Sequence, residues 1–118
     1  MDINYNGRRF RGKTNSPTGE VGNETVFHYF QEGNQLTGKY AGGAIVKGQL
    51  MGKVHPDGSL EFCYHHLNNN GEVMAGRCKS VPRRNTAGQL ILEERWQWFT
   101  GDQSTGRSVV EEVDNGTA

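Results

Sequence analysis

The chain has 118 residues, and we expect residues 1–118 to form a single domain. Its 13 basic and 13 acidic residues balance, which argues against general binding to nucleic acids or anionic membranes but leaves room for a local basic patch. No apolar run is long enough to span a membrane or act as a secretory signal, and two cysteines are too few for a disulfide scaffold, so we expect a cytoplasmic protein.

Turn-forming residues divide the first half of the chain into strand-like segments. The 17 glycines against 3 prolines are typical of many tight turns. A turn at residues 33–34 would place Tyr29 opposite Gly38 and Phe27 opposite Tyr40. A turn-rich loop is expected over 14–23. We predict strands over residues 7–12, 24–32, 35–41 and 44–54.

The strand over residues 44–54 alternates between a small apolar set and a partly charged set. We expect the apolar set to face the interior and the other set to face solvent. The inward set is Ala44, Val46, Gly48, Leu50, Gly52 and Val54, and the outward set is Ile45, Lys47, Gln49, Met51 and Lys53.

The second half of the chain repeats the same rhythm of strand and turn. A polar loop is expected over 81–88, and residues 114–118 are expected to form a frayed polar tail. We predict strands over residues 59–67, 72–80, 89–99 and 105–113.

The positions of the two cysteines depend on the turn near residue 70. A two-residue turn at Asn70-Gly71 would set Cys63 opposite Cys78, close enough for a disulfide. A three-residue turn with a glycine bulge would set Phe62 opposite Cys78 and turn Arg77 toward water. We favour the second register because it buries no cation, and it predicts two free thiols on opposite faces.

About eight short strands joined by short links predict an antiparallel up-and-down β-barrel. A barrel of this size has a filled interior or holds one small ligand, and its closure removes exposed strand edges. The alternative is a β-sandwich, whose crossing connections would have to run through the loops at 14–23 and 81–88.

A distinctive set of segments runs along nearly the whole chain, at residues 6–10, 27–29, 40–45, 71–72, 76–78, 96–98 and 101–104. By these segments the chain resembles a family of small bacterial proteins labelled N-acetylglutamate synthase. An acetyltransferase of the usual kind needs a glycine-containing loop at a helix N-terminus, and the sequence has no helix to follow such a loop, so we expect no such activity. By strand count and turn rhythm alone, the architecture also resembles avidin-like and lipocalin-like barrels, which hold small molecules.

The segment at 89–99 carries the strongest indication of a site. Its more apolar face is Leu90, Leu92, Glu94, Trp96 and Trp98, and a carboxylate facing inward needs a partner or a proton. Glu94 is expected to pair with an inward Tyr or Arg, to reach water at a barrel mouth, or to bind a ligand. The other polar groups expected on the inside are Tyr29, Tyr40, Tyr64 and His66.

Other reactive residues lack the spacing of a metal or catalytic site. His65 and His66 point to opposite faces of a strand, so we expect no metal and no cofactor. No nucleophile signature accompanies the serines. The short basic groups at residues 8–11 and 83–84 are interpreted as solvated surface.

Two functions follow from this interpretation. The first is a non-enzymatic barrel that binds a small molecule, and it requires an interior cavity of about a few hundred Å³. The second is an interaction or assembly module with a filled core. It would use an apolar outer wall to form a homodimer, and the residues expected on that wall are Val26, His28, Phe30, Ile45 and Met51.

Overall fold

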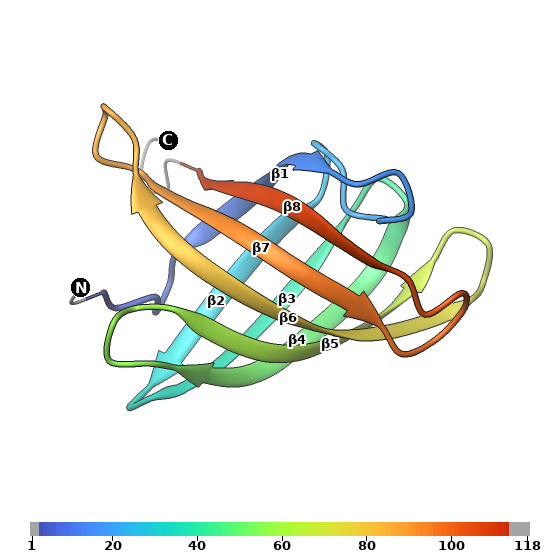
Figure 1. Ribbon diagram of the computed structural model, residues 1–118, viewed down its shortest axis with the longest axis horizontal. Helices are drawn as coiled ribbons and strands as arrows, with labels where there is room; N and C mark the ends of the chain where they lie inside the picture. The colour runs from blue at the N-terminus through green and yellow to red at the C-terminus, as the bar shows by residue number, and fades with distance from the viewer. Residues whose placement is uncertain (1–2, 114–118) are drawn as a thin grey trace.

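The structure of the protein, a computed structural model, describes residues 3–113, and within them the chain forms strands and no helix (Figure 1). No helix long and apolar enough to cross a membrane is therefore present in this part of the chain. The tail predicted at 114–118 lies outside the described residues. The strands are β1 (Arg9–Asn15), β2 (Val26–Glu32), β3 (Gln35–Gly42), β4 (Ile45–Val54), β5 (Leu60–Asn68), β6 (Val73–Arg84), β7 (Leu90–Trp98) and β8 (Thr105–Glu112).

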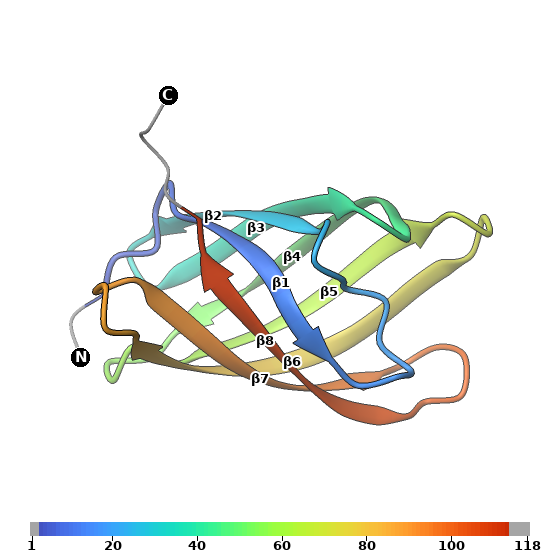
Figure 2. The ribbon, with the colours of Figure 1, turned by 90° about the horizontal axis from the view of Figure 1, so that it is seen from above.

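Each strand pairs antiparallel with the next, and β8 returns to pair with β1. Figure 2 shows β1 and β8 side by side at this closure. The predicted closed up-and-down barrel is confirmed, and the β-sandwich alternative is wrong. A bulge between Gly12 and Thr14 lets β1 bend toward β8, and β1 starts two residues later than predicted.

The registers expected from turn chemistry are confirmed at two hairpins. Tyr29 pairs with Gly38, and Phe62 pairs with Cys78. The Asn68 N–H donates to the Glu72 carbonyl at 3.0 Å, which closes the three-residue turn over 69–71. Both cysteines are free, with Cys63 exposed and Cys78 buried, because the two residues alternate across the sheet.

The loop predicted at 81–88 is wrong over 81–84, since β6 continues to Arg84 and pairs there with β7, and it is confirmed over 85–88, where the chain turns. Pro82, a residue type that usually interrupts a strand, lies opposite Leu92 in this pairing. The pairing of β6 with β5 ends at Ser80, so on that side the last residues of β6 form an edge. A proline is tolerated there because no β5 carbonyl lies opposite it to accept the hydrogen bond that proline, which lacks an N–H, cannot donate.

The start of β4 also differs from the prediction. Ile45, expected outside, is only 2% exposed, whereas Val46, expected inside, is 51% exposed. A register shift between Ile45 and Lys47 reverses the facing of the strand at this point. Beyond it Leu50 faces the interior and Met51 faces solvent, as expected.

Large aromatic side chains fill the interior by lying against glycines of the next strand. The Tyr40 ring covers Gly48, and the Trp96 indole covers Gly106 so closely that a Cβ atom there would overlap it. One end of the barrel is closed by Ile3 and Tyr5, whose hydroxyl donates to the Gly58 carbonyl at 2.6 Å. The other end is covered by the loop between β1 and β2, at the right in Figure 1.

Candidate functional site

The tryptophan strand β7 supplies one wall of the covered end. Glu94, Trp96 and Trp98 are buried and face inward, as the alternation predicts. Ile91, on the opposite face of the strand, is also buried, at 2% exposure. The inward face of β7 is therefore as predicted. On the outer face Ile91 is buried, although the other residues of that face, Glu93, Arg95 and Gln97, are polar.

A cavity of about 40 Å³ lies beneath the β1–β2 loop. A single water needs about 10–15 Å³, so this space holds a few waters and is far below the few hundred Å³ of an open ligand site. Of the seven predicted site residues, Tyr29 is not part of its lining. The six that line it are Tyr40, Tyr64, His66, Glu94, Trp96 and Trp98.

The Glu94 carboxylate is held by two serines that the sequence analysis missed. Ser80 Oγ donates to Oε2 at 2.8 Å and Ser108 Oγ donates to Oε1 at 3.0 Å. The expected partners, an inward Tyr or Arg, are wrong. Both serines are the direct cross-strand neighbours of Glu94, and aligning the inward positions of β6, β7 and β8 would have found them.

Burial is the main influence on the Glu94 carboxyl and raises its pKa. The bonds from Ser80, Ser108 and Cys78 act in the opposite direction. Burial also raises the pKa of the Cys78 thiol well above its ordinary value, so this cysteine stays protonated.

Tyr29 lies deeper in the barrel and is fully buried. Among the described residues, no group forms a hydrogen bond with its hydroxyl. Burial, and after it the charge of Glu94, raises the pKa of Tyr29 well above the ordinary value. A buried, unpaired hydroxyl near a carboxyl group is a free hydrogen-bonding position inside the barrel.

A hydrogen-bonded chain joins the opposite wall to the loop. Tyr40 Oη lies 2.8 Å from His66 Nδ1, and His66 Nε2 lies 2.7 Å from Glu20 Oε1. A carboxylate only accepts, so Nε2 carries the imidazole proton and Nδ1 accepts from Tyr40. Asn68 Nδ2 also donates to Glu20 Oε2 at 3.0 Å. Burial is the largest cause that raises the pKa of Tyr40.

The last residue of β1 and the β1–β2 loop also contact the tryptophans. Trp96 Nε1 donates to Asn15 Oδ1 at 3.0 Å, and Trp98 Nε1 donates to the Thr18 carbonyl at 3.1 Å. The sequence predicted a loop here but not its role, because nothing local to Glu20 or Thr18 indicates a partner more than 40 residues away.

The remaining candidates do not assemble a metal site. Within residues 3–113, no three His, Cys, Asp or Glu side chains come close enough together to bind an ion. His66 is buried inside the barrel, whereas His65 is exposed on the outer wall. The groups that the interior of the described barrel presents are hydrogen-bonding side chains and aromatic rings.

The comparisons with known proteins agree with this architecture. Neither the curated proteins nor the solved structures contain a significant match to the chain. The family model described as Avidin-like protein matches residues 3–113, which is nearly the whole chain and includes all eight strands. By this match and by its closed eight-stranded barrel, the chain belongs to the avidin-like family.

Proposed function

We propose that this protein binds a small molecule at the loop-covered end of the barrel and carries out no reaction on it. The observation that supports this most is the lining of the cavity. Aromatic walls from several strands surround Glu94 and His66 there. Aromatic surface with a few polar groups that converge is typical of ligand sites.

The β1–β2 loop occupies the position that the ligand would take. Gly19, Glu20 and Val21 line the cavity, so lifting the loop would enlarge it. Val21 contributes the apolar contact of the loop: it is a partly buried hydrophobic residue that packs against the core. Polar contacts hold the rest of the loop, with Ser16 and Thr25 bonded to the backbone of β8 and β3 at its two ends. Between them lie the contacts of Thr18 and Glu20, which water or a ligand can replace.

The contacts of Glu20 indicate what chemistry the ligand would offer. Its carboxylate accepts from His66 Nε2–H and from Asn68 Nδ2. When the loop lifts, these donors become available to an acceptor on a ligand, and a carboxylate matches both. A flat apolar body would then stack against Trp98 and Tyr64, whose rings already lie 5.6 Å apart.

Tryptophan fluorescence tests this proposal, because Trp96 and Trp98 both line the cavity. Flat small molecules that carry a carboxylate would be titrated into the wild type, Glu20→Ala and Glu24→Ala. Removing the competing Glu20 side chain raises the fraction of open protein, so Glu20→Ala should bind more tightly. The carboxamide analogue of each ligand should bind more weakly.

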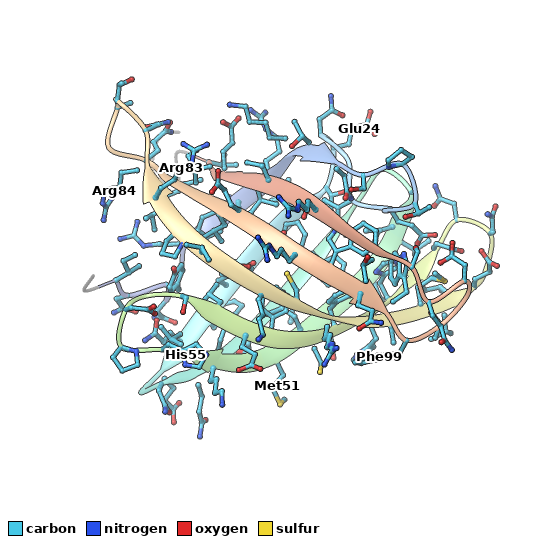
Figure 3. All side chains as sticks on the ribbon, in the orientation of Figure 1. Glu24, Met51, His55, Arg83, Arg84 and Phe99 are labelled. Atoms are coloured by element: carbon cyan, nitrogen blue, oxygen red, sulfur yellow. The ribbon has the colours of Figure 1, made fainter. Side chains whose placement is uncertain are left out.

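Glu24→Ala is the matched control, since Glu24 belongs to the same loop and is exposed at its surface, as Figure 3 shows. Its affinity should equal that of the wild type. A flat fluorescence response of both the wild type and Glu20→Ala to every compound would contradict binding at this end of the barrel.

The second candidate function is assembly with another copy through the outer wall. Phe30 is 37% exposed and its ring packs against that of His28 in a tilted arrangement, with ring centroids 4.4 Å apart. Met51 lies in the same cross-strand row with Thr37 between, but Ile45 is buried and does not contribute to the wall. A molar mass of twice the 13.1 kDa chain mass, measured by light scattering, would support a homodimer. The mass of one chain at high protein concentration would contradict it.

A further inference from the structure

The outer wall of β6, β7 and β8 carries a row of unpaired cations. Lys79 lies directly opposite Arg95 on the neighbouring strand, and Arg95 lies directly opposite Arg107 on the next one. All three are exposed. Within residues 3–113, none of their side chains forms an ion pair with a carboxylate. Like charges directly opposite one another destabilise a sheet, and an anionic partner would remove that cost.

This row differs from the basic groups that the sequence makes conspicuous. Arg8 contacts Glu112 at 2.6 Å, Arg11 contacts Glu111 at 3.4 Å, and Arg83 contacts Glu93 at 3.2 Å. Those local clusters are therefore partly neutralised. The unpaired cations come from three separate segments, which only the pairing of the strands brings together.

The cations lie in a broad open groove of about 1190 Å³ on the wall of β4 to β8. Five cations and one carboxylate, Glu61, line it. Glu61 lies directly opposite Lys79 in the β5–β6 register, but the residues that its carboxylate contacts as ion-pair partners are Lys53 and His55. Two exposed large apolar side chains also line the groove, Phe99 at 50% and Met51 at 70% exposure. Figure 3 shows both projecting outward from this side of the barrel.

We propose that this groove binds single-stranded nucleic acid. The row Lys79, Arg95 and Arg107 would contact successive phosphates, and bases would stack on Phe99, which lines the same groove two cross-strand rows away. Gln97 and Thr105 lie with Arg77 in the neighbouring cross-strand row, where Arg77 donates to Gln97 Oε1 at 2.9 Å. The Gln97 amide N–H and the Thr105 hydroxyl can form hydrogen bonds with base edges. The neutral net charge excludes general electrostatic binding, but it does not exclude a local groove with five cations.

The open shape of the groove favours a chain-like ligand over a small molecule, because a small anion would be bound from one side alone. The combination of unpaired cations with an exposed aromatic ring favours a nucleic acid over an acidic peptide, since a peptide of glutamates offers no ring to stack. This groove lies on the outer wall, so the inference does not depend on the proposed function of the interior.

Fluorescence anisotropy with a labelled oligothymidylate of about 12 nucleotides tests the inference. The wild type should bind at low salt. The logarithm of the affinity should fall with the logarithm of salt concentration with a slope of about −2, for three phosphate contacts. Arg95→Gln and Arg107→Gln should each weaken binding and reduce that slope by about 0.7. Phe99→Ala should weaken binding about tenfold with the slope unchanged.

Two control variants separate the groove from the rest of the wall. Arg83→Gln removes a cation that Glu93 already pairs, and Val81→Ala removes an exposed apolar side chain outside the groove. Both should bind like the wild type. Circular dichroism should show that all variants remain folded, since each changed side chain is exposed.

Three results would overturn the inference. The first is no binding by the wild type at low salt. The second is an affinity of Arg95→Gln and Arg107→Gln no lower than that of Arg83→Gln. The third is equal competition by unlabelled polyglutamate or duplex DNA, which would assign the groove to another class of partner.

Discussion

The Glu20 carboxylate lies 2.7 Å from His66 Nε2 and ties the β1–β2 loop to the wall of β5, 46 residues further along the chain. Glu20→Ala should release this loop, because a hydrogen bond to a charged group contributes about 1.5–3 kcal/mol. Amide hydrogen exchange should then rise about tenfold or more at Gly19 and Gly22, whose N–H groups are bonded within the loop.

The exchange of core amides in β5 should stay close to that of the wild type, which distinguishes loop opening from global unfolding. Glu24→Ala should leave the exchange of Gly19 and Gly22 unchanged. Equal loop exchange in wild type and Glu20→Ala would show that the polar contacts of Glu20 do not hold the loop.

Tyr29 and Tyr40 offer a matched pair of hydroxyl deletions with opposite expected signs. Tyr29→Phe removes a buried hydroxyl without a partner in residues 3–113, so stability should rise by about 1 kcal/mol. Tyr40→Phe leaves His66 Nδ1 without its partner and should cost about 1–2 kcal/mol. Urea unfolding measures both, and a loss of stability in Tyr29→Phe would show that its hydroxyl has a partner in solution.

Glu94 should give stability a defined pH dependence. Burial raises its pKa, so the folded state binds the proton more tightly than the unfolded state. Its contribution is greatest below the ordinary value of about 4.3 and is lost as the pH rises toward the raised pKa of the folded state. Glu94→Gln removes this titration while it keeps hydrogen bonds to Ser80 and Ser108.

The free energy of unfolding of Glu94→Gln, relative to wild type, should therefore increase with pH across that interval and then level off. Denaturant titrations at a series of pH values test this. Parallel curves for the two proteins would mean that Glu94 titrates alike in the folded and unfolded states. The same variant should lower the affinity for a ligand that contacts this carboxyl group.

Gly106 should tolerate no side chain, because a Cβ atom there would overlap the Trp96 indole. Overpacking of this kind costs about 1–3 kcal/mol, so Gly106→Ala should lower Tm by roughly 4 °C or more. Gly22→Ala is the control, since the space around Gly22 is open and the change should be within about 0.5 kcal/mol. Equal thermal melts of the two variants would contradict the close contact with Trp96.

Much of the barrel could be predicted because its determinants are local. The pairing of Tyr29 with Gly38 and of Phe62 with Cys78 follows from turn length and period-two alternation. Errors arose where a neighbouring strand overrides the local pattern. β6 continues through Pro82 because its pairing with β5 stops at Ser80, opposite the first residue of β5, and Ile45 turns inward because of a register shift.

The sequence by itself determined the strands, the order in which they pair and the inward position of Glu94, Trp96 and Trp98. Only the tertiary structure decided which groups surround that carboxylate, what the β1–β2 loop covers and where unpaired cations gather. The physical reason is that hydrogen bonds and ion pairs depend on distances between side chains of different strands. Glu20 contacts His66 only once the β1–β2 loop covers the barrel end, and Arg95 lies opposite Arg107 only once β7 and β8 have paired.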